Sequence, residues 1–192
     1  MKNTFCNVLS FLVALFFLQA NAQQIGKEEV CYNPNLVKDT SKKSLNSMAF
    51  TVIGGDSVNI RYHSPAVRKR IIWGGLVPFD EVWVTGAHDA TTLQVDKPFS
   101  VRGTNIPAGK YALFTIPGKK GWTIIINKHW QQHLATEYDR KDDVIRFSAK
   151  PRKNAHTERL QYDVQDKGNG KAVISIAWEK IKLEFDIYVS NQ

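Results

Sequence analysis

The sequence is poor in cysteine, with two cysteines among 192 residues. Cys6 stands before an apolar stretch near the start of the chain, and Cys31 stands in a polar stretch. Once residues 1–22 are removed, as argued below, Cys31 is the single thiol and cannot form a disulfide within the chain. The fold must therefore be stabilised by its hydrophobic core.

Several motifs that identify a reaction are also missing. The chain has no G-x-S-x-G turn of a serine hydrolase, no glycine-rich phosphate loop and no Cys/His cluster at metal-ligand spacing. We therefore predict no cofactor, and the sequence assigns no metal site from ligand spacing. The sequence by itself points to no single named reaction.

The chain also lacks a hydrophobic run long enough for a bilayer, which needs about 20 apolar residues in a helix. Its apolar run from Val8 to Leu18 follows Lys2 and is followed by the small residues Ala20 and Ala22. This pattern is typical of a signal peptide that is cleaved near Ala22/Gln23. We expect a periplasmic or secreted protein with no transmembrane segment in its mature chain.

Acidic residues are outnumbered by basic ones, so the chain has a formal net charge of +8, and loss of Lys2 with the signal peptide lowers it to +7. The cations fall in separate runs at 68–70, 119–120 and 150–153. A nucleic-acid-binding protein concentrates its cations on one face with aromatic residues between them. Scattered lysines in turns instead keep sheet edges soluble, so we predict that nucleic acid is not a partner.

Period-two alternation dominates the second part of the chain. Apolar and polar residues alternate over 58–63, 160–164 and 183–189, as expected for strands with one face on a core. Turn sequences such as Gly54-Gly55-Asp56 and Lys167-Gly168-Asn169-Gly170 separate the runs. We predict a single-domain antiparallel β-sandwich of about ten strands, with one short helix near 128–137.

These patterns divide the chain into three parts. Residues 1–22 form the signal peptide, residues 23–47 a flexible polar leader or loosely docked arm, and residues 48–192 the β-sandwich domain.

Five sequence blocks resemble domain-of-unknown-function family 2911, whose members are secreted proteins common in Bacteroidota. The matching blocks are Ser64-Pro65-Ala66-Val67; Ile72-Trp73-Gly74-Gly75-Leu76-Val77-Pro78; Val82-Trp83-Val84-Thr85-Gly86-Ala87 with Ala90-Thr91-Thr92; Ile106-Pro107-Ala108-Gly109-Lys110-Tyr111 with Leu113-Phe114-Thr115-Ile116-Pro117; and Trp122 with Asn127-Lys128. The resemblance implies an all-β domain outside the cytoplasm and implies no activity. Relatives usually carry Arg, Asn and Glu where this chain has Val84, His88 and Asp89.

The segment from Thr85 to Thr92 is the first candidate site. It places the imidazole of His88 and the carboxylate of Asp89 on one predicted loop, where scaffolded sites commonly lie. His88 would act as a general base or metal ligand with Asp89 beside it. The alternative is a polar turn that is capped by its own side chains.

A second candidate group contains Tyr62, His63, Arg70 and Trp73. An aromatic platform with arginine and histidine suits a sugar, a carboxylate or a peptide terminus. The alternative is that Trp73 belongs to the core and Arg70 is an exposed strand residue.

Two further groups are weaker. His129 and His133 would share one face of the predicted helix, but Glu137 would lie about 12 Å from His129 along the axis, too far to complete a zinc site. Asp139, Asp142 and Asp143 are interrupted by cations and lack the glycine-assisted turn of a calcium site.

We therefore predict a non-catalytic binding or envelope-associated module whose partner is a small molecule, a glycan or an envelope component. Its predicted ligand-binding face consists of Arg70, Trp73, Thr85, His88 and Asp89. The alternative is a hydrolase or metal-dependent enzyme in which His88, Asp89 and His63 are the catalytic candidates. A third possibility, a structural assembly subunit, would require an unpaired hydrophobic edge or patch.

Overall fold

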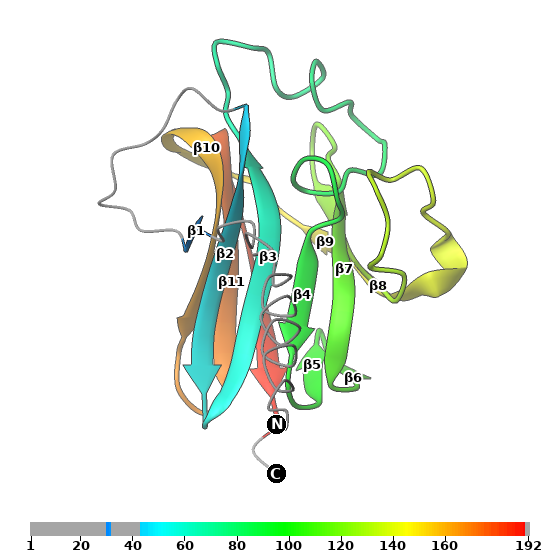
Figure 1. Cartoon of the computed structure of the whole chain (residues 1–192), viewed down its shortest axis with the longest axis vertical. Coiled ribbons are helices and arrows are strands. Elements are labelled where there is room, and N and C mark those ends of the chain that lie inside the picture. Colours follow the sequence, from blue (N-terminus) through cyan, green and yellow to red (C-terminus); the bar gives the residue numbers. More distant parts are fainter. Residues whose placement is uncertain (1–29, 32–42, 191–192) are drawn as a thin grey trace, which may run out of the picture.

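The computed structural model describes residues 30–31 and 43–190 of the chain (Figure 1). The predicted signal peptide and most of the predicted leader lie outside the described residues. Strand β2 begins at Ser44, so residues 44–47 belong to the sheet and not to the leader.

The described residues form two sheets that share one core. The larger sheet has the order β1-β2-β3-β4-β7-β8-β9 and consists of β1 (Val30–Cys31), β2 (Ser44–Ile53), β3 (Asp56–Pro65), β4 (Thr92–Val95), β7 (Gly109–Ile116), β8 (Trp122–Asn127) and β9 (Asp143–Ala149). The smaller sheet has the order β10-β11-β5-β6 and consists of β10 (Arg152–Asp166), β11 (Lys171–Val189), β5 (Phe99–Val101) and β6 (Thr104–Ile106). All neighbours pair antiparallel except β1, which pairs parallel to β2. The prediction of an all-β fold is confirmed.

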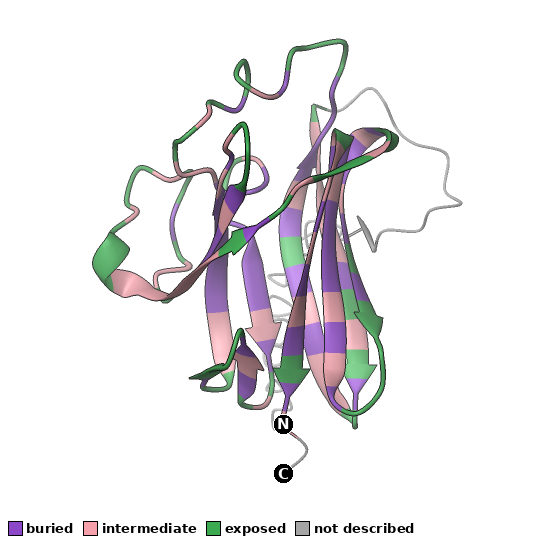
Figure 2. Cartoon of the chain, turned by 180° about the vertical axis from the view of Figure 1, so that it is seen from behind, coloured by how far each residue is buried: buried purple, intermediate pink, exposed green. Residues whose placement is uncertain are grey.

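The main core lies between the two sheets. Every second residue of β3 and of β11 points inward, so that Val58, Ile60 and Tyr62 meet side chains such as Leu160 and Tyr162 from β10. Figure 2 shows this alternation as buried bands along each strand. Each large apolar side chain removed from water contributes about 1.5–3 kcal/mol, so burial of this core is a major source of the stability of the fold.

The predicted helix near 128–137 is wrong. Within the described residues the chain forms a single short 3-10 helix, Arg140–Asp142, and residues 128–137 form bends and turns. Buried Asn127 explains the difference, because its side-chain oxygen accepts the His129 backbone N–H at 2.8 Å and its amide donates to the Asp139 carbonyl at 3.1 Å. Such side-chain bonds take up backbone groups that a helix would need.

A small second core lies on the outer face of the larger sheet. Ala112, Phe114 and Ile125 point outward from β7 and β8, and Val84 and Ala90 from the loop after β3 cover them. Trp130, Ala135 and Tyr138 from the loop after β8 pack against the same cluster. Two loops are therefore fixed against one half of the outer face, while the other half, over β2 and β3, stays uncovered by them.

Among the residues that the structure describes, no helix has the length and apolar character needed to cross a membrane.

Candidate functional site

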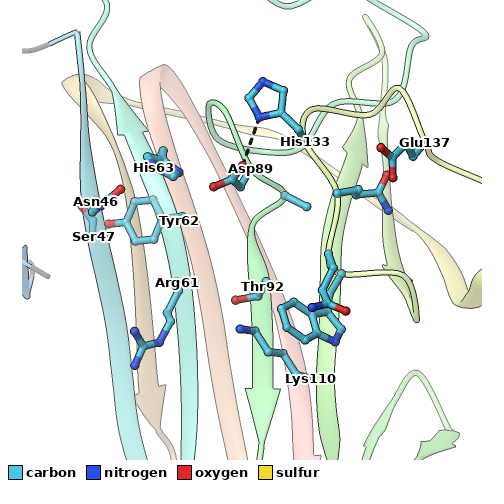
Figure 3. Close-up of a pocket in the computed structure, with 14 residues that line it drawn as sticks. Asn46, Ser47, Arg61, Tyr62, His63, Asp89, Thr92, Lys110, His133 and Glu137 are labelled. Atoms are coloured by element: carbon cyan, nitrogen blue, oxygen red, sulfur yellow. Dashed lines mark hydrogen bonds and ion pairs between the residues drawn. The ribbon is translucent and has the colours of Figure 1, made fainter. Parts of the chain in front are cut away.

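A cleft of about 560 Å³ lies on the outer face of the larger sheet, at the border between its β2–β3 half and the loops (Figure 3). Strands β2, β3, β4 and β7 form its floor, and the loop after β8 forms a wall. Its lining consists of Asn46, Ser47, Arg61, Tyr62, His63, Asp89, Ala90, Thr92, Lys110, Trp130, Gln131, Gln132, His133 and Glu137.

The strand register places two cations on either side of Thr92. Arg61 of β3 is paired with Thr92 of β4, and Lys110 of β7 is paired with Gln94, two residues further along β4. Because neighbouring strands lie about 4.8 Å apart, Arg61 and Lys110 are separated by two strand spacings across β4. Figure 3 shows the Thr92 side chain beside that of Lys110, with Arg61 on the neighbouring strand.

Two buried polar atoms in this cleft have no hydrogen-bond partner among the described residues. One is the hydroxyl of Thr92, whose residue is 7% exposed, and the other is the side-chain carbonyl oxygen of Gln132, whose residue is 5% exposed. A buried polar atom without a partner is costly, and native structures contain few of them. Both atoms belong to residues of the cleft lining, where a bound ligand could supply the missing partner.

Lys110 is held in an unusual electrostatic environment. Its Nζ lies 4.0 Å from the centroid of the Trp130 ring, a distance typical of a cation–π contact. Partial burial and, to a lesser extent, the positive charge of Arg61 lower the pKa of Lys110 below its ordinary value of 10.5. The cleft therefore contains a cation whose charged form an anion would stabilise.

Three histidines gather near the mouth of the cleft. The ring centroids of His63 and His88 are 5.1 Å apart, and those of His88 and His133 are 6.4 Å apart. His88 Nε2 and Ser44 Oγ share a hydrogen bond of 2.9 Å, while His133 Nδ1 lies 3.2 Å from Asp89 Oδ1. The carboxylate that follows His88 in the sequence thus contacts a different imidazole.

Backbone hydrogen bonds join the loop that carries His88 and Asp89 to the loop after β8. The Leu134 N–H donates to the His88 carbonyl at 2.7 Å, and the Ala90 N–H donates to the Gln132 carbonyl at 3.0 Å. His88 itself has a φ of 62°, in the left-handed region that histidine adopts only occasionally. The two loops are therefore joined as a pair, and the imidazole of His88 is directed by a fixed backbone conformation.

The positions of the histidines and carboxylates bear on the metal-site hypotheses. No group of three or more His, Cys, Asp or Glu in residues 43–190 is arranged to hold a metal ion. The sequence-based distance between His129 and Glu137 is wrong, because without a helix His129 Nε2 lies 4.0 Å from Glu137 Oε2. Asp139 accepts the Lys141 backbone N–H instead of facing a common ligand.

The five residues of the predicted binding face lie in different environments. His88 is exposed beside the cleft and Asp89 is exposed in its lining. Thr85 is 0% exposed, and its hydroxyl donates to the Trp83 carbonyl and shares a second hydrogen bond with the Thr115 hydroxyl. Thr85 therefore supports the loop from inside and is not available to a ligand. His63, from the second predicted group, lies in the cleft lining together with Asp89.

Arg70 and Trp73 are placed away from the cleft. The Arg70 guanidinium donates to the backbone carbonyls of Ala66 and Val67 and so braces its own loop. Trp73 packs edge-on against Trp83, Trp122 and Trp178. Trp73 is also packed against the main core, which supports the alternative interpretation that it is a core residue.

Sequence reasoning missed Arg61, Lys110, Trp130 and Gln132, and it included Thr92 only as one hydroxyl of the candidate loop. The alternation in β3 and β4 does place Arg61 and Thr92 on outward faces. Their proximity to Lys110 depends on β4 pairing with β7 across the intervening β5–β6 hairpin, which no local pattern reveals.

Comparison with known proteins gives a family and no activity. The chain matches the family described as "Protein of unknown function (DUF2911)" over residues 44–187. No match is found among curated proteins or among solved structures. Since the matched region covers both sheets and the cleft, the chain belongs to the DUF2911 family of proteins of unknown function.

Proposed function

We propose that the protein is a non-catalytic binding module that holds a small anionic ligand, such as a carboxylated or phosphorylated sugar, in the cleft between Arg61 and Lys110. The observation that carries this proposal is the buried Thr92 hydroxyl, which has no partner among the described residues and lies on β4, between the two strands that carry the cations. A ligand oxygen at this position would accept a hydrogen bond from Thr92.

The charges in the floor favour an anion. Within the described residues Lys110 forms no ion pair, and the repulsion from Arg61 contributes to its lowered pKa. A carboxylate or phosphate placed over Thr92 would be attracted to both cations, and arginine binds such groups through paired N–H donors.

The walls favour a ligand that also forms neutral hydrogen bonds. Asn46, Gln131 and Gln132 line the cleft and supply amide donors and acceptors, and the Gln132 carbonyl oxygen lacks a partner among the described residues. Sugar hydroxyls can donate to such an oxygen and accept from an amide. A simple inorganic anion would leave these groups unused.

The test compares ligands of one shape and different charge. Thermal unfolding is followed with glucuronate, glucose phosphate and neutral glucose, and a ligand at about 100 times its dissociation constant adds about 2.7 kcal/mol to stability. We expect stabilisation by one or both charged sugars and none by glucose. Equal effects of all three sugars, or no effect of any of them, would contradict the proposal.

Two matched variants locate the binding. Lys110→Met removes the cation in the cleft, whereas Lys180→Met removes a well-exposed cation from β11, outside the cleft lining. The first variant should lose the stabilisation by the charged sugar and the second should keep it. Loss in both variants would indicate a nonspecific charge effect.

We also propose that the protein acts outside the cytoplasm, either in the periplasm or after secretion. The support is the short apolar run at Val8 to Leu18 with small residues at Ala20 and Ala22. The intact mass of the protein recovered from the periplasm or culture medium should correspond to a chain that begins at Gln23. A recovered chain that still begins at Met1 would refute the cleavage.

A second candidate function is hydrolysis with Ser44 as nucleophile and His88 as its base. The hydrogen bond of 2.9 Å between Ser44 Oγ and His88 Nε2 favours it, because a nucleophile and its base must lie within such a distance. A fluorophosphonate probe should then label the protein, and Ser44→Ala should abolish the labelling. An unlabelled protein would leave binding as the function.

A further inference from the structure

One end of the sandwich combines exposed aliphatic side chains with cations. This end, called here the loop end, consists of the loop at 66–80 after β3 and the β7–β8 turn at 117–121, and both lie at the top of Figure 1. The Asp80 N–H donates to the Pro117 carbonyl at 2.8 Å, and Lys119 Nζ lies 5.9 Å from the Phe79 ring centroid. The two segments therefore form one continuous surface.

The loop is anchored from below. Ile72 and Val77 are buried in the main core, and Trp73 packs among three other tryptophans. Backbone hydrogen bonds close the loop, since the Leu76 N–H donates to the Ile71 carbonyl at 3.0 Å and the Val77 N–H to the Ile72 carbonyl at 2.9 Å. The tip of the loop therefore has a fixed conformation, which holds its outward side chains in place.

Ile71 and Leu76 point away from that anchor. Ile71 is 78% exposed and Leu76 is 46% exposed, and the hydrogen bond between their backbones keeps them adjacent. Single exposed apolar side chains are common on protein surfaces. Two neighbouring aliphatic residues on a rigid, protruding loop form a small apolar tip that is surrounded by charge.

Cations border this tip on two sides. Arg68 and Lys69 precede it in the loop, and Lys119 and Lys120 lie on the adjoining turn, all four exposed. Arg68 and Lys69 have φ values of 49° and 59°, in the left-handed region where glycine or asparagine would be less strained. These positions therefore present cationic side chains in spite of an unfavourable backbone conformation.

We propose that the loop end docks on an anionic lipid bilayer, with Ile71 and Leu76 entering the interface and the four cations binding lipid phosphates. Interfacial binding depends on buried apolar area together with attraction between cations and anionic headgroups. A bilayer offers both components on one surface. A soluble polyanion such as a nucleic acid or an acidic polysaccharide offers only the charge and leaves the aliphatic tip in water.

Vesicle cosedimentation tests the proposal. The protein without residues 1–22 should bind vesicles of equimolar phosphatidylglycerol and phosphatidylcholine, and should not bind vesicles of phosphatidylcholine alone. Binding should weaken as salt shortens the screening length. Equal binding to both vesicles, or to neither, would overturn the proposal.

Charge variants at the two ends of the sandwich provide a matched control. Lys119→Gln with Lys120→Gln should lower the partition coefficient roughly tenfold or more, because each surface cation contributes roughly fivefold. Arg102→Gln with Lys167→Gln makes the same change of net charge in turns at the opposite end, after β5 and after β10. If both double variants bind equally weakly, net charge and not the loop end is responsible.

The apolar component is tested in two ways. Ile71→Ser with Leu76→Ser should weaken vesicle binding and leave binding to soluble dextran sulfate unchanged; equal losses would show that the tip does not enter the bilayer. Ile71→Cys, made with Cys31→Ser and labelled with an environment-sensitive dye, should shift its emission to the blue on anionic vesicles. An unchanged emission would also overturn insertion.

A glycine variant separates binding from folding. Arg68→Gly with Lys69→Gly removes two cations and relieves the left-handed strain at both positions. This double variant should be at least as resistant to unfolding as the original protein and yet bind anionic vesicles more weakly. Full retention of vesicle binding would exclude these two cations from the docking surface.

Discussion

The hydroxyl of Tyr162, in β10 of the smaller sheet, donates a hydrogen bond of 2.8 Å to the backbone carbonyl of Thr85. Tyr162 is almost fully buried, and Thr85 begins the loop that carries His88 and Asp89. The loop beside the cleft is therefore attached through the core to the opposite sheet. Burial raises the pKa of Tyr162 well above 10, so this hydroxyl remains a donor throughout the physiological range.

Tyr162→Phe should destabilise the protein and loosen this loop. The buried Thr85 carbonyl loses this donor but still accepts a hydrogen bond of 3.1 Å from the Thr91 hydroxyl. The loss should therefore be about 0.5–1.5 kcal/mol of unfolding free energy. Urea denaturation measures the loss. Tyr188→Phe, at a half-exposed position on β11, should change stability by less than about 0.5 kcal/mol; an equal loss in both variants would contradict a specific role for the Tyr162 hydroxyl.

Thr92→Val should have opposite effects on folding and on binding. Valine has nearly the same shape and removes a buried hydroxyl that has no partner among the described residues, so stability should stay the same or rise by about 1 kcal/mol. Affinity for the charged sugar should fall, because the ligand loses its donor at the cleft floor. Thermal unfolding with and without ligand measures both effects.

Thr115→Val is the control for Thr92→Val. Thr115 is also buried, but its hydroxyl shares a hydrogen bond of 3.0 Å with the Thr85 hydroxyl. Its loss should therefore lower stability by about 1 kcal/mol. A destabilised Thr92→Val variant would mean that the Thr92 hydroxyl has a partner in the folded protein and is not reserved for a ligand.

The sequence predicts the strands of this fold better than its loops. Alternation in β3 and β11 reflects which face meets the core, and this is a local property of each strand. The segment at 128–137 contains residues that suit a helix, but Asn127 binds the backbone on both sides of it. Its conformation is therefore decided by one buried amide outside the predicted helix.

The sequence likewise predicts some residues of the candidate site and not others. The chemistry of His63 and Asp89 marks them as candidates in the sequence, and both line the cleft. Thr85 is a candidate because it shares the loop of Asp89, yet it is fully buried. Arg61 and Lys110 are two strands apart in space and 49 positions apart in sequence, so only the sheet order reveals them as a pair.

Ligand affinity should depend on pH through Lys110. The protonated lysine binds an anion, so affinity is fully present below the pKa of Lys110 and is lost as pH rises through it. Because burial and Arg61 lower this pKa, the loss should begin at a lower pH than for an ordinary lysine of pKa 10.5. Titration calorimetry across alkaline pH should show this decline, together with proton uptake on binding.

Lys110→Arg is the control for that pH dependence. Arginine keeps its charge far above the working range, so the variant should bind the anion with an affinity that stays constant where the original protein weakens. The same decline in both proteins would assign the titration to another group.

Asn127→Ala should make the loop after β8, which forms a wall of the cleft, more mobile. The Asn127 amide donates to Asp143 Oδ1 at 2.9 Å and to the Asp139 carbonyl at 3.1 Å, and its oxygen accepts the His129 N–H. Alanine leaves these groups without their partner, which should lower the unfolding free energy by about 2 kcal/mol or more.

Hydrogen exchange should localise this effect. Backbone amides in 128–139 should exchange faster in Asn127→Ala, whereas those of the β10–β11 hairpin should change little, since local opening need not involve the whole fold. Gln131→Ala, at an exposed position in the same loop, should leave both regions unchanged. If the loop exchanges at its original rate in Asn127→Ala, the packing of Trp130 and Tyr138 against Phe114 must hold the wall without the amide, and Phe114→Ala becomes the variant that opens it.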